Sequence, residues 1–418
     1  MSVGVVRGEE RTFCQVGDGS YQLTVRSLGI QFTVDRLRRE RHELIGELAV
    51  ACALAPSRAV DGYLSIADMN LSSAHARNTR AKLLALRSDT LDIDWDSLLE
   101  ELCVRTINAE RLGSPARELS TYERGGVNAL LDINGWPWLR DHPMITFADG
   151  GGLKSYLALY GVGVLSQRGM RVGYADWELS GEEHRDRLDR LFGSELPVIH
   201  YFHCDKPLVD EVDRLGRESR KLGLEYLVFD SAGFATAGPP EAAEETLAYF
   251  RAVRQIGVGS HHLAHVNRSE NADKKPFGSN YWHNSARMTW FAKAVPNTMD
   301  SSRVSVGLFH RKSNVTKQFT PRGFDFTFTE NATIVSPIQV ADVGELAGEL
   351  KLWQRIEHLL KTRGGTPISI QEIADELDAK PDSVKKAVGR PTGQKSIFTE
   401  VMGADGKPRI ALVARRVL

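Results

Sequence analysis

Residues 147–155 combine the residue types that bind a phosphate group, in the order Phe-Ala-Asp-Gly-Gly-Gly-Leu-Lys-Ser. Glycines let backbone N–H groups curl around an anion, a lysine adds a positive charge, and a serine hydroxyl can bind Mg²⁺. The residues that we expect to contact a nucleotide phosphate are Asp149, Gly150, Gly151, Gly152, Leu153, Lys154 and Ser155.

The elements on either side of this stretch are those that a phosphate-binding loop needs. Residues 144–147 are an apolar run typical of a buried strand, and residues 156–165 have helical character. The loop would therefore lie at a strand-to-helix turn, where the positive end of the helix faces an anion. The pattern departs from GxxxxGK[ST] at Ala148 and Leu153, where glycine is expected. A glycine-rich turn that binds nothing is the alternative interpretation.

Two further predicted strands end in carboxylates that ATP hydrolysis could use. The apolar run 227–229 ends in Asp230, the arrangement called Walker B, which would complete the Mg²⁺ shell with Ser155. The strand 171–175 is followed by Asp176-Trp177-Glu178, and Glu178 is our candidate for the general base. The alternatives are a turn aspartate at 230 and a carboxylate at 178 that caps the next helix.

A histidine-rich strand end supplies a candidate sensor of the γ-phosphate. The run His261-His262-Leu263-Ala264-His265 would place His261 and His265 on one face of a strand. We assign the sensor role to His265, because it ends the strand as Asp230 and Glu178 end theirs. A zinc site is less well supported, since no cysteine cluster or HExxH pattern accompanies these histidines. A histidine buried in the core is the other alternative.

The pattern from Trp136 onward predicts an α/β domain with a parallel sheet covered on both faces. Apolar strands are expected at 171–175, 196–202, 225–229 and 256–266, alternating with helices at 183–192, 210–222 and 241–255. Antiparallel strands are then expected at 286–295, 302–311, 325–329 and 333–336. A parallel sheet with a phosphate loop on its first strand and an antiparallel extension is the RecA-type plan.

Residues 1–120 predict a mixed α/β accessory domain in front of the ATPase domain, which we place at 121–340. Alternating strands are expected at 21–25 and 30–34, and helices at 74–86 and 96–111. Four arginines fall within residues 36–41. A solvated face is the simpler interpretation of this basic run, and a nucleic-acid contact is the alternative.

The end of the chain predicts a winged helix-turn-helix domain at 351–418, after a linker at 341–350. Helices are expected at 349–361, 369–377 and 381–389, and strands at 397–402 and 409–414. Thirteen Lys or Arg against eight Asp or Glu give residues 351–418 a net charge of +5. We expect DNA contacts from Lys385, Lys386, Arg390, Lys407 and Arg409. Docking of another protein is the alternative.

Composition limits the partners and the compartment. The 418 residues have a formal net charge of −1, so any DNA binding must come from a local patch. The four cysteines are far apart and form no CxxC pair, which favours a reducing compartment without a zinc site. No run approaches the ~20 apolar residues of a membrane span, and residues 1–13 lack the apolar core of a signal peptide. We expect a cytoplasmic protein with no membrane contact.

Several of these stretches together resemble the RepA-like hexameric helicase ATPases of plasmids and phages. The resemblance covers about residues 120 to 340. It is carried by the loop 148–155 with Tyr-Leu-Ala-Leu after it, and by Asp176-Trp177-Glu178 with Arg185 and Leu188. It continues through Phe229-Asp230-Ser231 and the long tract 265–290, and ends in Arg311-Lys312-Ser313-Asn314. Within the tract, Lys275-Pro276-Phe277-Gly278-Ser279 is part of the most specific portion.

The resemblance implies an ATP- and Mg²⁺-dependent homo-oligomer, a hexameric ring with single-stranded DNA in a central pore. It implies that Lys154, Ser155, Glu178, Asp230 and His265 form the nucleotide site. Arg287 would be an arginine finger acting on the neighbouring subunit, with Lys293 as the second candidate, and Lys274 and Lys275 would face the DNA. A solvated loop is the alternative for these two lysines.

Three functions follow as hypotheses. The first is an ATP-driven DNA helicase or translocase for mobile-element replication. The second is an ATP-gated DNA-binding regulator or loader with slow or no hydrolysis, and the third is a scaffold ATPase that does not bind DNA. A base, a sensor and a finger at Glu178, His265 and Arg287 favour an active hydrolase, and the basic C-terminal domain argues against the third hypothesis.

Overall fold

The structure is a computed structural model, and it describes residues 11–53, 59–88, 93–113, 116–122, 129–266, 276–315, 317–389, 397–403 and 405–413. Its contacts divide the chain into two compact units. The first comprises Met1–Asn128, Leu208–Gly223 and Ala248–Val258, and the second comprises the rest. The DNA-contact candidates Lys274, Lys275 and Arg390 lie outside the described residues.

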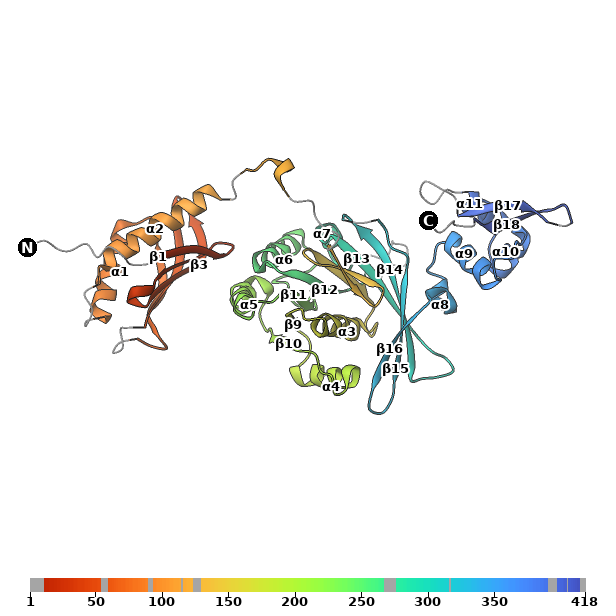
Figure 1. The fold of residues 1–418 in the computed structure, drawn as a ribbon, viewed down its shortest axis with the longest axis horizontal. Coiled ribbons are helices and arrows are strands. Elements are labelled where there is room, and N and C mark those ends of the chain that lie inside the picture. Colours follow the sequence, from red (N-terminus) through yellow and green to blue (C-terminus); the bar gives the residue numbers. More distant parts are fainter. Residues whose placement is uncertain are drawn as a thin grey trace, which may run out of the picture. The chain divides into compact units, whose positions relative to one another are not determined.

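The first unit is built on a five-stranded antiparallel sheet in the order β1-β2-β3-β4-β5 (Figure 1). Its strands are β1 (Arg11–Gly17), β2 (Ser20–Val25), β3 (Ile30–Glu40), β4 (Glu43–Cys52) and β5 (Tyr63–Asn70). Its helices are α1 (Ala74–Arg87), α2 (Trp95–Leu112) and α5 (Leu208–Leu222). The strands and helices expected within residues 1–120 are confirmed. They share a core, in which Phe32 of β3 is buried and packs edge-on against Trp95 of α2.

Two of the four arginines in the basic run of the first unit are paired with carboxylates. Arg38 forms ion pairs of 2.8 Å with both Glu40 and Asp68, and Arg36 lies 3.2 Å from Glu47. Such exposed pairs contribute little to stability, but they neutralise charge that a nucleic-acid phosphate would need. This arrangement supports the interpretation of the run as a solvated face.

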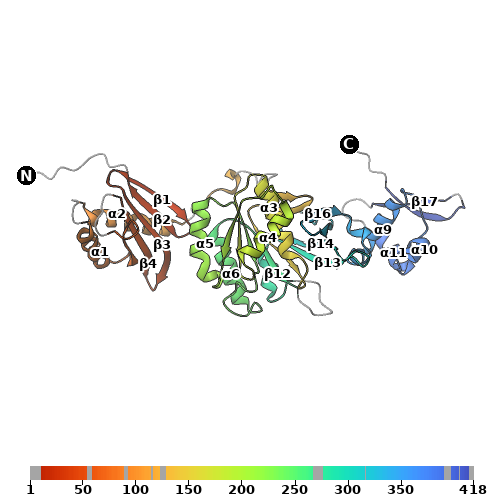
Figure 2. The ribbon, with the colours of Figure 1, turned by 90° about the horizontal axis from the view of Figure 1, so that it is seen from below.

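The second unit contains a nine-stranded sheet in the order β10-β9-β11-β12-β8-β13-β14-β15-β16 (Figure 2). Its first five strands are parallel and are β8 (Pro143–Ala148), β9 (Val172–Asp176), β10 (Ile199–His203), β11 (Tyr226–Asp230) and β12 (Gly259–His265). The extension is β13 (Met288–Pro296), β14 (Arg303–Ser313), β15 (Arg322–Phe328) and β16 (Thr333–Ile338). The predicted α/β class and its RecA-type plan are confirmed.

The predicted succession of antiparallel strands is confirmed, since β13 pairs with β14, β14 with β15 and β15 with β16 in antiparallel register. The sequence did not show how this extension joins the parallel strands: β13 also pairs with β8 in parallel, with Met288 opposite Met144. A parallel neighbour requires a crossover that returns the chain to the same end of the sheet. The long connection from β12 to β13, which includes α7 (Asn280–Ser285), provides that crossover. An apolar strand pattern does not reveal its direction, so the sequence could not show this pairing.

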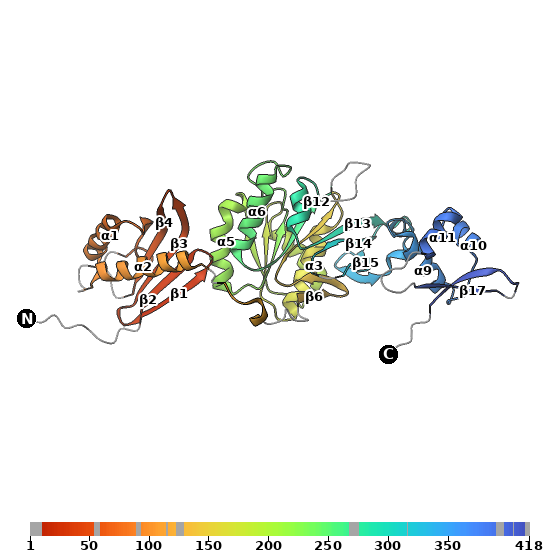
Figure 3. The same ribbon diagram turned by 90° about the horizontal axis from the view of Figure 1, so that it is seen from above.

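Two helices of the second unit begin near the edge of the sheet where β8, β9 and β11 end. α3 (Lys154–Gln167) follows β8 directly, and α4 (Gly181–Phe192) follows β9 after a short turn. α3 contacts α4. It also contacts β6 (Leu130–Ile133), a strand that the sequence did not predict and that lies beside α3 in Figure 3. β6 forms a hairpin with β7 (Trp136–Leu139), whose four residues are all buried. α6 (Ala243–Ile256) is shared between the two units.

The last part of the second unit consists of short helices and a hairpin, in the order expected of a winged helix-turn-helix. After α8 (Gly344–Ala347) come α9 (Leu352–Thr362), α10 (Ile370–Glu376) and α11 (Pro381–Gly389), then β17 (Phe398–Met402) and β18 (Pro408–Leu412). Ser369 and Glu372 form a capping box at the start of α10. Ile356, Ile373, Val384, Phe398 and Ile410 share one core. Among the helices that the structure describes, none is long and apolar enough to cross a membrane.

Candidate nucleotide-binding site

The glycine-rich loop joins the carboxyl end of β8 to the start of α3, as the sequence predicts. Gly151 has a φ of +73°, a conformation that glycine adopts without strain. A Cβ atom on Gly152 would lie 2.8 Å from the Ala148 Cβ and 2.9 Å from the Asp149 carbonyl oxygen, so no larger residue fits there without a shift. A Cβ on Gly150 would meet open space. The fold therefore requires glycine at two of the three positions.

Leu153, which stands where the motif has glycine, adopts a backbone conformation that favours glycine. Its φ is +55° and its ψ is +22°, in the left-handed region, and it is the N-cap residue of α3. For a residue with a Cβ, this region costs about 1–2 kcal/mol. The Leu153 side chain is partly buried against the main core of the unit, which offsets part of that cost. The loop thus keeps the expected backbone path despite its imperfect sequence.

Lys154 is buried at the base of the loop. Its side chain is 8% exposed, and its Nζ donates to the Asp149 carbonyl oxygen at 3.1 Å. Burial lowers the pKa of Lys154, while the negative charges of Asp230, Glu178 and Asp149 oppose that shift. The nearby acidic groups thus help to keep the Lys154 ammonium group charged. A charged ammonium group at the base of the loop can bind the phosphate group of a nucleotide.

The carboxylate of Asp230 meets the hydroxyl of Ser155 at the end of β11. Asp230 is 2% exposed, it is hydrogen-bonded to the Ser155 side chain, and it accepts a hydrogen bond of 2.7 Å from the Tyr174 hydroxyl. Burial raises the pKa of Asp230 to about 6; the charges of Asp176 and Glu178 act in the same direction, and the two hydrogen bonds oppose them. A hydroxyl and a carboxylate side by side are oxygen ligands of the kind that Mg²⁺ prefers, so the two residues fit the predicted metal role.

Glu178 lies on the turn that follows β9, next to the end of β11. Its carboxylate accepts a hydrogen bond from the Ser231 hydroxyl, directly after Asp230 in the chain. The alternative role, capping the next helix, is wrong: Ser180 caps α4, in a capping box with Glu183. Glu178 is exposed, so its carboxylate can reach a water molecule in the site.

Asp176, His184 and Tyr174 lie beside Asp230 and form an acidic cluster with it. The sequence analysis assigned these three residues no role. Asp176 is fully buried opposite Asp230 in the sheet register, and its Oδ2 lies 2.6 Å from the His184 Nε2. Ligand atoms of Asp176, His184 and Asp230 all lie within 4.8 Å of one another. An aspartate that ends a strand was the available signal for Asp176, but nothing in the sequence pointed to a histidine on the following helix.

The histidines of β12 separate into two environments. His265 ends the strand, is exposed, and pairs in register with Ala148, which places its backbone beside the start of the loop. His261 and His262 are buried; the His261 Nε2 lies 2.8 Å from the Thr146 hydroxyl. Burial lowers the pKa of His262 to about 3 and lowers that of His261 well below its usual value. The core-histidine interpretation thus applies to His261 and His262.

Arg287 does not join the nucleotide site of its own chain. It is exposed and comes one residue before β13, at the amino end of the sheet, whereas the loop follows the carboxyl end of β8. An arginine finger at this position would therefore have to act on the site of another subunit. The second candidate, Lys293, lies 3.2 Å from the Glu349 carboxylate.

The candidate DNA-contact residues of the last helices are accessible where the structure describes them. Lys385 and Lys386 on α11 and Lys407 before β18 are exposed. Arg409 is partly buried, and its guanidinium lies 3.3 Å from the Asp405 carboxylate. No ion pair of these three candidate lysines is seen among the described residues.

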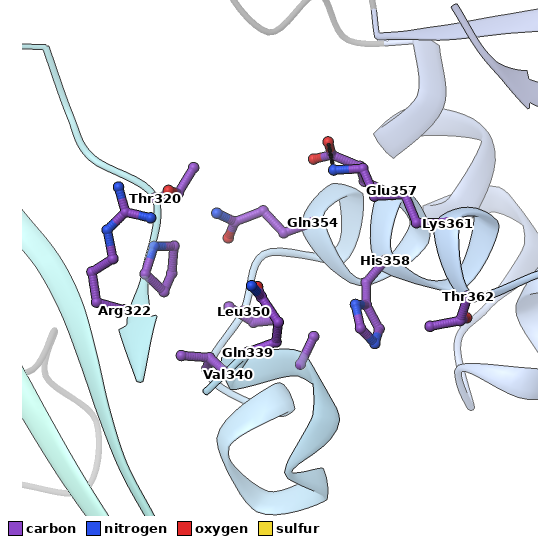
Figure 4. A pocket seen from close by; sticks show the side chains of 12 residues that line it. Thr320, Arg322, Gln339, Val340, Leu350, Gln354, Glu357, His358, Lys361 and Thr362 are labelled. Atoms are coloured by element: carbon purple, nitrogen blue, oxygen red, sulfur yellow. Dashed lines mark hydrogen bonds and ion pairs between the residues drawn. The ribbon is translucent and has the colours of Figure 1, made fainter. Parts of the chain in front are cut away.

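A pocket of about 470 Å³ lies apart from these groups, beside the start of β15 and along α9 (Figure 4). Arg322, Gln339, Gln354 and His358 are among its lining residues. Its charged groups on α9 are already paired, Lys361 with Glu357 at 2.7 Å and His358 with Asp342 at 3.1 Å. None of the lining residues belongs to the phosphate loop or its acidic cluster, so we assign this pocket no part in catalysis.

The left-handed conformation of Leu153 can be tested by stability. Leu153→Gly and Leu153→Ala both remove the packed side chain, but only glycine removes the backbone strain. We expect the glycine variant to be more stable than the alanine variant by about 1 kcal/mol, the reverse of the usual order in a helix interior. Urea unfolding of the two variants measures the difference. A more stable alanine variant would show that Leu153 is not held in the left-handed region.

Comparisons with known proteins add little to this geometry. No protein-family model matches the chain, and no curated protein matches it. The KaiC-like protein PH0186 from Pyrococcus horikoshii OT3 is 13% identical, with a TM-score of 0.39 over 53% of this chain and 100% of that one. A second solved structure, the ATPase domain of another protein, is 14% identical, with a TM-score of 0.40 over 48% of this chain and 86% of that one. Both scores are too low to carry an argument, so the assignment of function rests on the site itself.

Proposed function

We propose that this chain is a RecA-type ATPase that uses ATP and Mg²⁺ to move along DNA as a helicase or translocase. The observation that supports the ATPase most directly is the contact of Ser155 with Asp230 beside the buried Lys154. These three residues come from the loop and from the end of another strand, and together they offer one cation and two oxygen ligands for a metal-bound triphosphate.

Each residue of the cluster has a defined task in this proposal. The loop N–H groups and Lys154 bind the β- and γ-phosphates, and Ser155 and Asp230 hold Mg²⁺, which neutralises charge on the phosphate oxygens. Glu178 orients the attacking water and accepts its proton. His265 contacts the γ-phosphate from the next strand, and Arg287 acts on the site of the neighbouring subunit, which requires a ring or another homo-oligomer.

The assignment of DNA as partner rests on the exposed lysines of α11 and the hairpin. Residues 351–418 carry a net charge of +5, and Lys385, Lys386 and Lys407 are exposed. We propose that this part is a winged helix that contacts DNA phosphates, and that a hexameric ring passes single-stranded DNA through its centre. The sequence resemblance suggests plasmid or phage replication as the context, and the composition suggests the cytoplasm.

A regulator or loader that binds ATP but hydrolyses it slowly is the second candidate. The observation that favours it is Leu153, whose side chain stands where the motif has glycine, directly before the phosphate-binding lysine. Turnover distinguishes the two candidates.

Glu178→Gln tests the catalytic assignment. The amide keeps the size of the side chain but cannot accept a proton, so we expect kcat to fall by about 10²-fold or more, with the affinity for Mg²⁺·ATP nearly unchanged. Steady-state ATPase and calorimetric titration measure the two quantities. Glu225→Gln, which changes a carboxylate at the other end of the sheet, is the control. Loss of nucleotide binding in Glu178→Gln would mean that Glu178 is structural.

The Lys385→Ala/Lys386→Ala double variant tests the DNA contact. Removing two phosphate contacts should weaken DNA binding similarly for all sequences and reduce the slope of log K against log salt by about 2. Fluorescence anisotropy over a salt series measures both effects. Lys361→Ala, a lysine of α9 that is paired with Glu357, is the matched control. Unchanged DNA affinity in the double variant would favour a protein-docking role.

A further inference from the structure

A buried histidine and a buried aspartate lie behind the candidate general base. The His184 Nε2 on α4 lies 2.6 Å from the Asp176 Oδ2 at the end of β9, and the two residues are 5% and 0% exposed. Since an ionised carboxylate can only accept, the imidazole N–H donates to it. Neither residue touches the phosphate loop through a hydrogen bond that the structure describes.

The same aspartate holds the turn that carries Glu178. The backbone N–H of Glu178 donates to the Asp176 Oδ1 at 2.9 Å, and that of Leu179 donates to the Oδ2 at 3.2 Å. One carboxylate therefore receives three hydrogen bonds, two from the turn and one from His184. The backbone N–H of Trp177 donates to the Asp230 carbonyl oxygen at 2.7 Å. This hydrogen bond also connects the turn to the end of β11.

We propose that Asp176 and His184 are positioning residues that fix Glu178 for hydrolysis, an inference that rests on the proposed ATPase function. Burying this polar pair has a desolvation cost, and an apolar pair of the same volume is often at least as stable. Its specific effect is geometric: His184 fixes the Asp176 carboxylate, which fixes the backbone of Glu178. A displacement of about 1 Å at a reacting group can cost about 10²-fold in rate.

A pocket next to His184 makes a direct test possible. It has a volume of about 280 Å³ and is lined by His184 together with Leu159, Leu188, Pro197 and Ile199. The His184 Nδ1 has no hydrogen-bond partner among the described residues, so the ring is held by its Nε2 and by packing against the rings of Tyr174 and Tyr201. The lining also includes Tyr174, Arg185 and Tyr201, so the walls are partly polar. If the ring is removed by mutation, a free imidazole molecule has space to enter and donate to Asp176 in its place.

The experiment measures ATP turnover of full-length His184→Ala with and without added imidazole. We expect kcat to fall by about 10- to 100-fold with little change in the KM for ATP, because Lys154 and Ser155 are untouched. Imidazole should restore a large part of kcat. Leu188→Ala is the matched control: it enlarges the same pocket but removes no contact of Asp176, so it should keep its kcat and not respond to imidazole.

A second pair of variants keeps the test valid if His184→Ala folds poorly. His184→Gln keeps an N–H donor near the Nε2 position, whereas His184→Leu fills the space without a donor. We expect the glutamine variant to retain most of kcat and the leucine variant to lose it at equal thermal stability. Equal kcat in these two variants, or a His184→Ala enzyme that works at the wild-type rate, would overturn the positioning role.

Failure of the proposed function gives a different result. A wild-type protein without ATP turnover would remove the ATPase assignment, and the positioning role with it. A wild-type protein that turns over ATP, combined with a His184→Ala loss that imidazole does not relieve and that appears equally in Leu188→Ala, would overturn the positioning role alone. In that case the pair would serve only the packing of α4.

Discussion

The hydrogen bond between the Ser155 hydroxyl and the Asp230 carboxylate is the contact on which the candidate site depends. It joins the first turn of α3 to the end of β11, although β12 lies between β11 and β8 in the sheet. Parallel strands make this contact possible, because their carboxyl ends meet at one edge. The buried Lys154 lies beside it, and the acidic groups around the site keep a cation favourable there.

Much of this arrangement could be predicted, because it depends on local patterns. Apolar runs that end in Asp176, Asp230 and His265 identified the strands and the edge to which they point. The Gly-Gly-Gly-Leu-Lys-Ser run identified the turn between β8 and α3. Parallel strands bring such ends together whatever their order, so the sequence could indicate a shared site without knowledge of the pairing.

The remaining features depend on contacts between segments far apart in the chain. The parallel pairing of β13 follows from a crossover, not from its residues. The partnership of His184 with Asp176 depends on how α4 packs beside β9, and a histidine among the charged residues of that helix gives no sign of burial. The left-handed backbone at Leu153 was also hidden, since leucine rarely adopts it.

The most direct test of the account is the steady-state ATPase activity of the purified protein with and without single-stranded DNA, compared with Lys154→Ala. The account predicts turnover that DNA stimulates and that the Lys154→Ala variant lacks, because the variant has no cation at the base of the loop. Equal turnover in the wild type and the Lys154→Ala variant, or no turnover by the wild type under any condition, would contradict the claim that this loop and Asp230 form an ATP-hydrolysing site.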